Sequence, residues 1–354
     1  MDSLSEQFAA RLLVWQREHG RHDLPWQVSD PYRVWLSEVM LQQTQVRSVL
    51  AYYPRFLAEF PDVATLAQAS LDAVLAQWSG LGYYSRARNL HRAAQQIMAQ
   101  HQGIFPTQFE DILALPGVGR STAAAISAFA FAQRRAILDG NVKRVLCRAF
   151  GVEGWSGDKH VEQRLWALSE SLLPPSPTEM ATYTQGLMDL GSLCCTRSRP
   201  ACERCPFTAD CVAQTSGRTR ELPFPRPKKV QPTRSTLMVW FQHEGQMLLM
   251  RRPSSGIWGG LWSFPELNCS GEVAALAEKL HCTQYEILPT LPEFEHVFTH
   301  FRLVITPQPV AVGHIAKSTA LADDFVWASP DAALRLGLPA PVRRLIEQAT
   351  GQIF

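Results

Sequence analysis

The sequence contains no run of apolar residues long enough to span a lipid bilayer, and its first residues lack the basic start and apolar stretch of a secretory signal peptide. We therefore expect a cytoplasmic protein with no membrane partner. A strong net charge is also absent, because 34 lysines and arginines against 32 aspartates and glutamates leave a formal charge of +2. Any surface that binds a polyanion must therefore be a local patch.

Disulfide bonds are not expected, because the eight cysteines would lie in a reducing compartment. Four of them share one short segment with the spacing Cys-x6-Cys-x2-Cys-x5-Cys, and these are Cys195, Cys202, Cys205 and Cys211. Four thiolates so close in sequence can enclose a zinc ion or an iron–sulfur cluster. Structural zinc more often uses two separated Cys-x-x-Cys pairs, so the single loop favours the cluster. The other four cysteines follow no such pattern, and we interpret them as buried or incidental.

At 354 residues, of which 46% are hydrophobic, the chain is long enough for two hydrophobic cores. Residues 217–234 are rich in proline, lysine and arginine and predict a semi-rigid linker. Apolar patterns predict a mainly α-helical domain over residues 1–216 and an α/β domain over residues 235–354. The expected helices include residues 5–20, 31–46 and 62–79, and the expected strands include residues 237–241, 247–251 and 297–307.

A hairpin between two helices is predicted where Gly117 and Gly119 flank a single valine. The N–H groups at the start of the alanine-rich helix that follows would point at an anion, and Arg120 and Lys143 add positive charge nearby. A DNA backbone is the natural ligand of such a turn. The same turn also occurs in many proteins that never bind nucleic acid, so it does not decide the function alone.

Glu38 is the first candidate for catalysis. It shares one face of a predicted helix with Val34 and Leu41, so a carboxyl group stands in an apolar stripe. Burial there would raise its pKa and keep it protonated for general acid catalysis, whereas a place at the rim would leave it solvated.

Asp139 precedes a helix expected to begin near Val142, where aspartate is an ordinary N-cap. If Asp139 also faces Glu38, the two carboxyls can divide acidic and electrostatic roles.

A second glycine turn, around Gly82, presents Tyr83 and Tyr84 beside Arg86. Aromatic rings next to arginines suit stacking against nucleic-acid bases while the cations hold phosphates. The alternative is that the two tyrosines pack in a core and leave only their hydroxyl edges wet.

The hairpin, Asp139 and the four-cysteine segment together resemble the helix-hairpin-helix DNA glycosylase superfamily, in the branch that carries a 4Fe-4S cluster. Residues 35–46, with the sequence Trp-Leu-Ser-Glu-Val-Met-Leu-Gln-Gln-Thr-Gln-Val, narrow the resemblance to MutY-type adenine DNA glycosylases. Residues 255–265 are similar to the 8-oxoguanine recognition domain of that family, which resembles Nudix hydrolases. Residues 268–280 offer no Arg-Glu-x-x-Glu-Glu run to hold Mg²⁺ and a pyrophosphate, so we expect this domain to bind without hydrolysing.

The resemblance also implies roles for the site residues. Glu38 would protonate N7 of a flipped-out adenine, and Asp139 would stabilise the oxocarbenium-like sugar that remains. Asn141 would position the substrate, Trp26 would line the base pocket, Gln43 and Tyr83 would wedge into the base stack, and Phe298, Thr299 and His300 would read 8-oxoguanine. The remaining residues expected to contact DNA are Gly117, Gly119, Lys143 and Arg86. The four cysteines of the segment are the implied cluster ligands.

Ser121 distinguishes two mechanisms. In relatives of the endonuclease III type, a lysine at this position attacks C1′ of the sugar and forms a Schiff base. Serine cannot form an imine, so the resemblance implies a monofunctional glycosylase that leaves an abasic site. A bifunctional glycosylase/lyase, a non-catalytic mismatch-binding protein and a nucleotide-pool hydrolase are the alternatives. The missing lysine argues against the glycosylase/lyase, and the intact carboxyl pair argues against the mismatch-binding protein. The missing Arg-Glu-x-x-Glu-Glu run argues against the nucleotide-pool hydrolase.

The resemblance further implies the partners. The expected ligand is duplex DNA that contains adenine opposite 8-oxoguanine or guanine, bound by a monomer associated with the nucleoid. Repair and processivity proteins are expected to dock on the linker.

Overall fold

The computed structural model describes residues 3–227, 231–298, 300–316 and 324–350. Contacts divide the chain into two compact units. The first, here the helical unit, comprises residues 1–67 and 92–228, and the second, here the mixed unit, comprises residues 68–91 and 229–354. Residues 68–91 thus group with the sheet that follows the predicted linker. Within the described ranges no helix is both long and apolar enough to cross a membrane.

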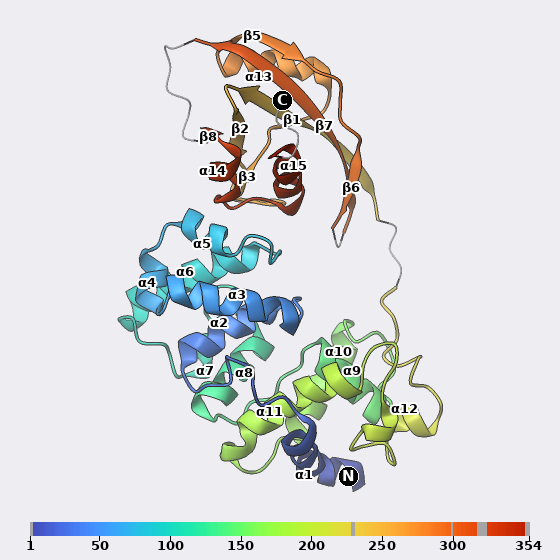
Figure 1. Cartoon of the computed structure of the whole chain (residues 1–354). Helices are drawn as coiled ribbons and strands as arrows, with labels where there is room; N and C mark the ends of the chain where they lie inside the picture. The colour runs from blue at the N-terminus through green and yellow to red at the C-terminus, as the bar shows by residue number, and fades with distance from the viewer. Residues whose placement is uncertain (1–2, 228–230, 299, 317–323, 351–354) are drawn as a thin grey trace. The chain divides into compact units, whose positions relative to one another are not determined.

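The helical unit consists of short helices joined by loops (Figure 1). They are α1 (Ser3–His19), α2 (Pro31–Leu41), α3 (Val46–Glu59), α4 (Val63–Gln68), the later part of α6 (Ser85–His101), α7 (Phe109–Leu113), α8 (Arg120–Phe131), α9 (Gly140–Ala149), α10 (Lys159–Ser171), α11 (Met180–Asp189) and α12 (Val212–Thr215). Between them lie the short turns η1 (Pro177–Glu179), η2 (Leu190–Cys194) and η3 (Cys202–Arg204). The glycine hairpin therefore leads into α8, Asp139 leads into α9, and η2 leads into the cysteine segment.

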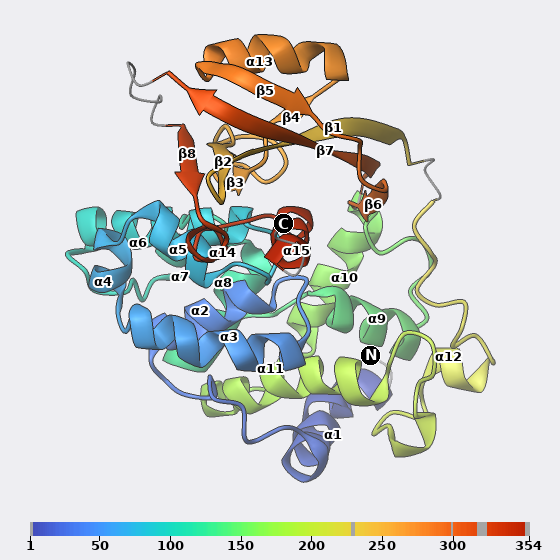
Figure 2. The same cartoon turned by 45° about the horizontal axis from the view of Figure 1, so that its top comes forward.

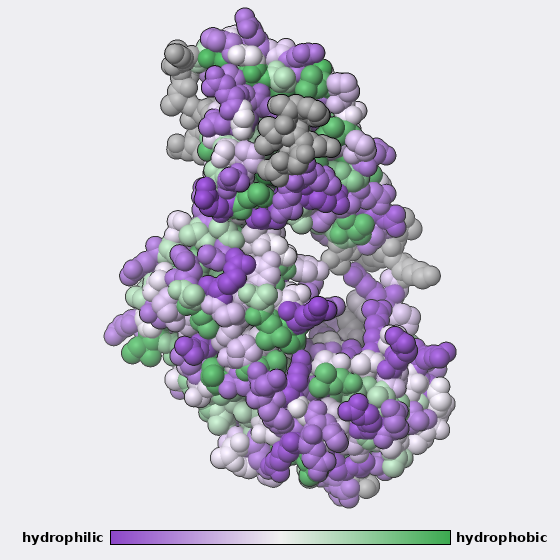
Figure 3. All heavy atoms as spheres, in the orientation of Figure 1, coloured by the Kyte–Doolittle hydropathy of each residue, from purple (hydrophilic) through white to green (hydrophobic). Residues whose placement is uncertain are grey.

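Helix α8 lies in the core of the helical unit because its side chains are small. Ala123, Ala124 and Ala125 are all buried, and both α2 and α11 pack against the helix. Helix α1 joins the same core, where the ring of Phe8 stacks on Phe207 with 4.3 Å between centroids. Hydrophilic residues cover much of the face of this unit in Figure 3, and hydrophobic ones appear there in small groups. The apolar residues that recur with helical periodicity in the sequence are therefore the ones buried in the core.

Two predicted helices are shorter than expected. The helix expected to reach residue 46 ends at Leu41, because Gln43 adopts a left-handed backbone with φ of 57°. The side chain of Gln42 donates instead to the carbonyl oxygen of Gly117 at 3.3 Å, so a contact with the hairpin accompanies the break. The helix expected over residues 62–79 is two helices. Ser70 caps a new helix, α5 (Leu71–Gln77), because its side chain accepts the N–H of Ala73 at 3.2 Å.

The mixed unit is built on one sheet with strand order β3-β2-β1-β7-β5. Its strands are β1 (Thr233–His243), β2 (Gln246–Arg251), β3 (Trp262–Ser263), β4 (Glu266–Leu267), β5 (Cys282–Ile287), β6 (Phe294–Val297), β7 (Arg302–Ile315) and β8 (Phe325–Ala328). Only the long β1–β7 pair is parallel among the described pairings. Helix α13 (Val273–Lys279) covers one face, and α14 (Pro330–Leu334) and α15 (Ala340–Thr350) lie on the other (Figure 2).

The strand expected over residues 297–307 is interrupted in the structure. Strand β6 ends at Val297 and pairs antiparallel with β7, which begins at Arg302. The N–H of Phe298 donates to the carbonyl oxygen of Phe301 at 2.9 Å, and the two rings stack with 4.6 Å between centroids. The chain reverses here because this aromatic pair closes a turn, which alternation of residue types cannot reveal. Thr299, predicted to read 8-oxoguanine, lies outside the described residues.

We expect Asp189 to be the most sensitive polar position of the helical core. Its fully buried carboxylate accepts from the backbone N–H and the Nε of Arg21, at 2.8 and 2.7 Å, and from Gln185 at 2.9 Å. Asp189→Ala should lower the free energy of unfolding by about 3 kcal/mol, because Arg21 and the buried amide of Gln185 both lose their buried acceptor. Urea denaturation would measure this. Asp210→Ala, which breaks a half-exposed pair with Arg11, is the matched control and should cost less than about 1 kcal/mol. Equal losses in the two variants would contradict the expectation.

Candidate active site and nucleic-acid interface

Glu38 stands at the wall of a small cavity in the helical unit. Helix α2 begins at Pro31, and its N-cap Asp30 accepts the N–H of Arg33 at 3.0 Å. From this start, one helix face carries Val34 into the core and places the partly buried carboxyl of Glu38 beside it. The cavity has a volume of about 40 Å³, and Trp26 also lines it. This space suits a few water molecules and is too small for a purine.

The environment of Glu38 favours its protonated form. Burial and, to a smaller extent, the neighbouring carboxylate of Asp139 raise the pKa of this carboxyl to about 8. Both causes penalise the charge, so Glu38 carries a proton at neutral pH. Of the two arrangements that the sequence allowed, the structure therefore shows the buried one. A carboxylic acid with this pKa can donate a proton to a bound base.

Asp139 has both of the features that the sequence left open. It caps α9 by accepting the N–H of Val142 at 2.8 Å, and it also lies close enough to Glu38 to affect its ionisation. Burial raises the pKa of Asp139, whereas N–H donors and the cations Arg144 and Lys143 act in the opposite direction. The net shift of the Asp139 pKa is upward, but these donors favour its charged form, whereas no hydrogen bond or cation lowers the pKa of Glu38.

Arg144 connects the start of α9 to the cysteine segment. Its Nη2 donates to Oδ1 of Asn141 at 2.9 Å and to the carbonyl oxygen of Gly191 at 2.5 Å, and its Nε donates to the carbonyl oxygen of Cys195 at 2.8 Å. The contact is tight, since a Cβ at Gly191 would lie 2.5 Å from Cβ of Asn141. The sequence patterns predicted positive charge near the hairpin but not this link between Arg144 and the cysteine segment. The sequence signal for this contact is that Arg144 follows Asn141 by three residues on a predicted helix, so the two side chains share a face.

Ser121 supports the loop that precedes Asp139. Its Oγ accepts the N–H of Leu138 at 3.0 Å. The hydroxyl therefore holds the backbone that carries the catalytic candidate. This contact is compatible with the predicted absence of an amine nucleophile at this position.

The glycine hairpin has the open surface that a phosphate needs. Gly117 has φ of 79°, and Gly119 caps α8 with no protein atom within 4 Å of where a Cβ would stand. An outside group can therefore approach the N–H groups of α8 closely. The predicted cations nearby already have partners, since Arg120 pairs with Glu170 and Lys143 pairs with Glu162 at 2.5 Å. An incoming phosphate has to compete with these two carboxylates, which sequence reasoning did not foresee.

The cysteine segment encloses a second cavity, of about 20 Å³. All four predicted ligands line it, and so does Cys194, which was expected to be incidental. The buried guanidinium of Arg148 donates to Sγ of Cys195 at 3.4 Å and to the carbonyl oxygens of Thr196 and Arg197 at 2.7 and 2.9 Å. Among the described residues, no three His, Cys, Asp or Glu side chains converge on a point that could hold a single ion.

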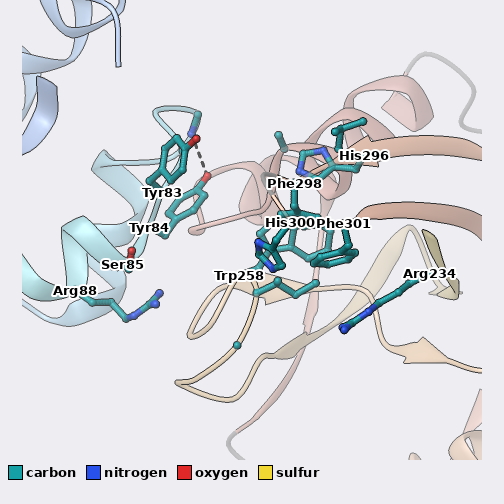
Figure 4. A pocket seen from close by; sticks show the side chains of 16 residues that line it. Tyr83, Tyr84, Ser85, Arg88, Arg234, Trp258, His296, Phe298, His300 and Phe301 are labelled. Carbon is teal, nitrogen blue, oxygen red and sulfur yellow. Dashed lines mark hydrogen bonds between the residues drawn. The ribbon is translucent and has the colours of Figure 1, made fainter. Parts of the chain in front are cut away.

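The mixed unit contains a larger cavity, of about 730 Å³ (Figure 4). Tyr83, Tyr84 and Arg88 lie on one side of it in Figure 4, and an aromatic cluster that includes Phe298 and His300 lies on the other. In that cluster the rings of Phe298 and Trp258 are 5.3 Å apart, and those of Phe298 and His300 are 6.2 Å apart. Flat aromatic walls with an arginine at the rim suit a planar, electron-rich ligand such as a nucleobase.

Of the residues on the glycine turn, Tyr83 is the exposed one. Its side chain is 48% exposed, whereas the hydroxyl of Tyr84 donates to the carbonyl oxygen of Leu338 at 2.8 Å. Arg86 is buried, packs over the ring of Trp78 and donates to the carbonyl oxygen of Gly82 at 3.0 Å. The predicted phosphate contact of Arg86 is therefore replaced by support of the turn that presents Tyr83. Gln43, the other predicted wedge, is exposed at its strained position after α2.

Comparison with known proteins agrees with this arrangement. Residues 36–171 match the family described as HhH-GPD superfamily base excision DNA repair protein, and residues 236–348 match the NUDIX domain family. The adenine DNA glycosylase of Buchnera aphidicola subsp. Acyrthosiphon pisum is 37% identical over 348 residues, which cover 98% of this chain and 99% of that protein. The adenine DNA glycosylase of Homo sapiens is 31% identical over 408 residues, which cover 98% of this chain and 74% of that protein.

Two solved structures share the fold of about three fifths of the chain. A thermostable thymine-DNA glycosylase has a TM-score of 0.55 at 27% identity and covers 60% of this chain and 97% of its own. Endonuclease III in a non-covalent complex with DNA has a TM-score of 0.52 at 20% identity and covers 62% of this chain and 100% of its own, which shows the fold alone. The predicted fold class, a helix-hairpin-helix domain followed by a Nudix-like α/β domain, is confirmed.

The raised pKa of Glu38 should make stability depend on pH. A carboxyl whose folded pKa is about 8 and whose unfolded pKa is ordinary stabilises the fold fully below its unfolded pKa, and this stabilisation is lost as the pH rises through about 8. Between about pH 5 and pH 9 the chain should therefore lose about 2–4 kcal/mol relative to Glu38→Gln. Chemical denaturation of both proteins at each pH measures the difference. Parallel pH profiles of the two proteins would show that Glu38 ionises freely.

Proposed function

The chain belongs to the adenine DNA glycosylase family, and from this premise we propose that it removes adenine from duplex DNA where adenine is mispaired with 8-oxoguanine or guanine. The observation that carries the proposal is the carboxyl pair of the helical unit. Glu38 is an acid with a pKa of about 8 at the wall of a cavity, and Asp139 is the carboxylate beside it. This is the division of roles that cleavage of an N-glycosyl bond to a poor leaving group requires.

The first step is protonation of the base. Adenine leaves poorly as an anion, so Glu38 donates its proton to N7 of the flipped adenine, and the electron pair of the C1′–N9 bond departs with the base. Neutral adenine is released, and a positively charged, oxocarbenium-like sugar remains. The cavity beside Glu38 is too small for a purine, so Trp26 or a neighbouring side chain has to move when the base enters.

The second step is capture of the sugar. The negative charge of Asp139 stabilises the cationic sugar, a water molecule forms the bond to C1′, and its proton returns to the carboxylate of Glu38. Asn141 positions the nucleotide, and Arg144 keeps the amide of Asn141 in place through its bond to Oδ1. Ser121 has no amine and is engaged by Leu138, so no Schiff base forms there and the product is an intact strand with an abasic site.

The DNA backbone binds at the hairpin in this proposal. Gly117 and Gly119 leave the N–H groups at the start of α8 accessible to a phosphate. Lys143 exchanges Glu162 for phosphate when DNA binds, which makes affinity steeply dependent on salt. Gln43 and Tyr83 are exposed at left-handed backbone positions and enter the base stack.

Recognition of 8-oxoguanine is assigned to the large cavity of the mixed unit. Its aromatic walls and its volume of about 730 Å³ suit a purine, with Phe298 and His300 on one wall and Tyr83 on another. Thr299, assigned to the same task, lies outside the described residues. The exposed imidazole of His300 can donate to or accept from the edge of the base, which gives the cavity its polar specificity.

A 4Fe-4S cluster is the proposed cofactor, with Cys195, Cys202, Cys205 and Cys211 as ligands. These residues fit it, because their side chains surround one cavity and a cubane takes one thiolate on each iron. The cationic Arg148 beside Cys195 suits a centre of negative charge. When bound, the cluster supplies a rigid cross-link that holds the segment together.

The proposed reaction is tested by single-turnover base release from a duplex with adenine opposite 8-oxoguanine, with each time point divided between an alkaline and a neutral quench. Strand breaks should appear only after alkali, and Glu38→Gln should abolish them while DNA binding persists. The rate should fall about tenfold per pH unit above about pH 8, as Glu38 loses its proton. Breaks after a neutral quench would indicate a lyase, and binding without any release would indicate a mismatch-binding protein.

The proposed cofactor is tested by iron content. The purified chain should contain about four iron atoms, and Cys202→Ser should lose most of them together with thermal stability. Cys269→Ser is the matched control, because Cys269 is exposed in the mixed unit and should leave both quantities unchanged. One zinc atom per chain in place of iron would reject the cluster.

A further inference from the structure

The mixed unit has a second cavity that the proposed reaction does not use. It has a volume of about 560 Å³, and Trp240, Met247 and Pro309 form its buried floor. Trp240 lies between Val239 and Phe241 on β1, both of which pack beneath α13. Because side chains alternate along a strand, the cavity opens on the sheet face opposite α13.

The cavity is held open by the backbone around it. The segment after β5 forms one wall, where the N–H of Leu288 donates to the carbonyl oxygen of Pro309 at 3.1 Å and the N–H of Leu291 donates to that of Pro307 at 3.0 Å. The side chain of Gln308 donates to the carbonyl oxygen of Leu288 at 2.6 Å. The wall is therefore preformed, and a ligand that binds there orders little of the protein.

The charge around this cavity is negative. Glu244 lines it, and no lysine or arginine does so among the described residues. Gln242 also lines the cavity and pairs with Ala311, which in turn pairs with Glu286 of the edge strand β5, so Glu286 lies on the same face. Asp331 is exposed next to the lining residue Pro330.

The two large cavities of the mixed unit differ in the charged side chains that line them. The cavity that contains Tyr83 is lined by Arg88 and Arg234, which suit a phosphate backbone, whereas among the described residues the second is lined by Glu244 and by no lysine or arginine. A phosphate chain would be repelled there. An apolar floor with an acidic rim instead matches a cationic protein segment that carries a bulky apolar side chain.

We infer that this cavity docks a basic peptide segment of another protein, with one leucine- or phenylalanine-sized side chain on the floor of Trp240, Met247 and Pro309. Lysines or arginines beside that anchor lie against Glu244 and Glu286. The inference is independent of the proposed base excision, since none of these residues belongs to the carboxyl pair, the hairpin or the aromatic cavity.

The test uses the full chain with ¹³C-labelled methionine methyl groups, and Met247→Leu assigns the resonance of Met247. Two peptides are titrated to about 1 mM: Ac-Lys-Arg-Leu-Phe-Pro-Arg-NH₂ and its counterpart with glutamate at each basic position. The basic peptide should shift the Met247 resonance in a saturable way, and the acidic peptide should bind at least tenfold more weakly. The double variant Glu244→Gln/Glu286→Gln should weaken the basic peptide about tenfold, and base release should remain unchanged.

Glu278→Gln is the matched control, because Glu278 is an exposed acid on α13, on the opposite face of the sheet. It should leave peptide affinity unchanged. The inference is overturned if the Met247 resonance does not respond to the basic peptide or responds equally to both peptides. It is also overturned if a short DNA duplex shifts this resonance, which would make the face a DNA contact, or if dilution alone shifts it, which would indicate a second copy of this chain. Base release is measured separately, so its failure would not be mistaken for failure of docking.

Discussion

The proposed chemistry of this protein depends on the free-energy cost of ionising Glu38 in its buried position. The carboxyl is taken out of water by the apolar face of α2 and faces the carboxylate of Asp139, so its pKa rises to about 8. Other parts of the helical unit serve this pair. Helix α2 begins at Pro31, directly after its N-cap, and this start sets the helix face on which Glu38 lies. Helix α9 begins directly after Asp139, which is its N-cap. In the proposed reaction, a general acid and a charged partner thus arise from two residues of similar intrinsic acidity.

Helix α9 transmits the position of the carboxyl pair to the cysteine segment. Its first turn carries Asp139 and Asn141, its second carries Arg144, and its last carries Arg148. The two arginines hold carbonyl oxygens on the segment that contains Cys195, so its geometry and that of the active site share one rigid element. The proposed cofactor in that segment would therefore affect the proposed base release through the protein, without touching the substrate. Helix α9 and the guanidinium groups of Arg144 and Arg148 make this connection.

The mixed unit shows how charge can separate functions on one fold. Its sheet retains the Nudix-like layers but lacks the acidic run that would hold Mg²⁺ and a pyrophosphate, so the scaffold is free for recognition. One cavity has aromatic walls and arginines, and the other has an apolar floor and carboxylates. In our proposals, the same small domain thus presents one surface for a polyanion and another for a basic peptide.

The sequence by itself determined the fold class, the family and the identity of the candidate residues, because these depend on local signals such as helix periodicity, glycine at the hairpin and cysteine spacing. It could not determine whether Glu38 is buried, since burial depends on Trp26, Met188 and Asp139, which lie far away in the chain. It also could not show that Arg86 is buried beneath its turn or that Lys143 and Arg120 are already paired with carboxylates. The break of the predicted helix after Leu41 and of the predicted strand after Val297 has the same origin. In each case a contact between distant residues outweighs a weak local preference, and only the tertiary structure contains that contact.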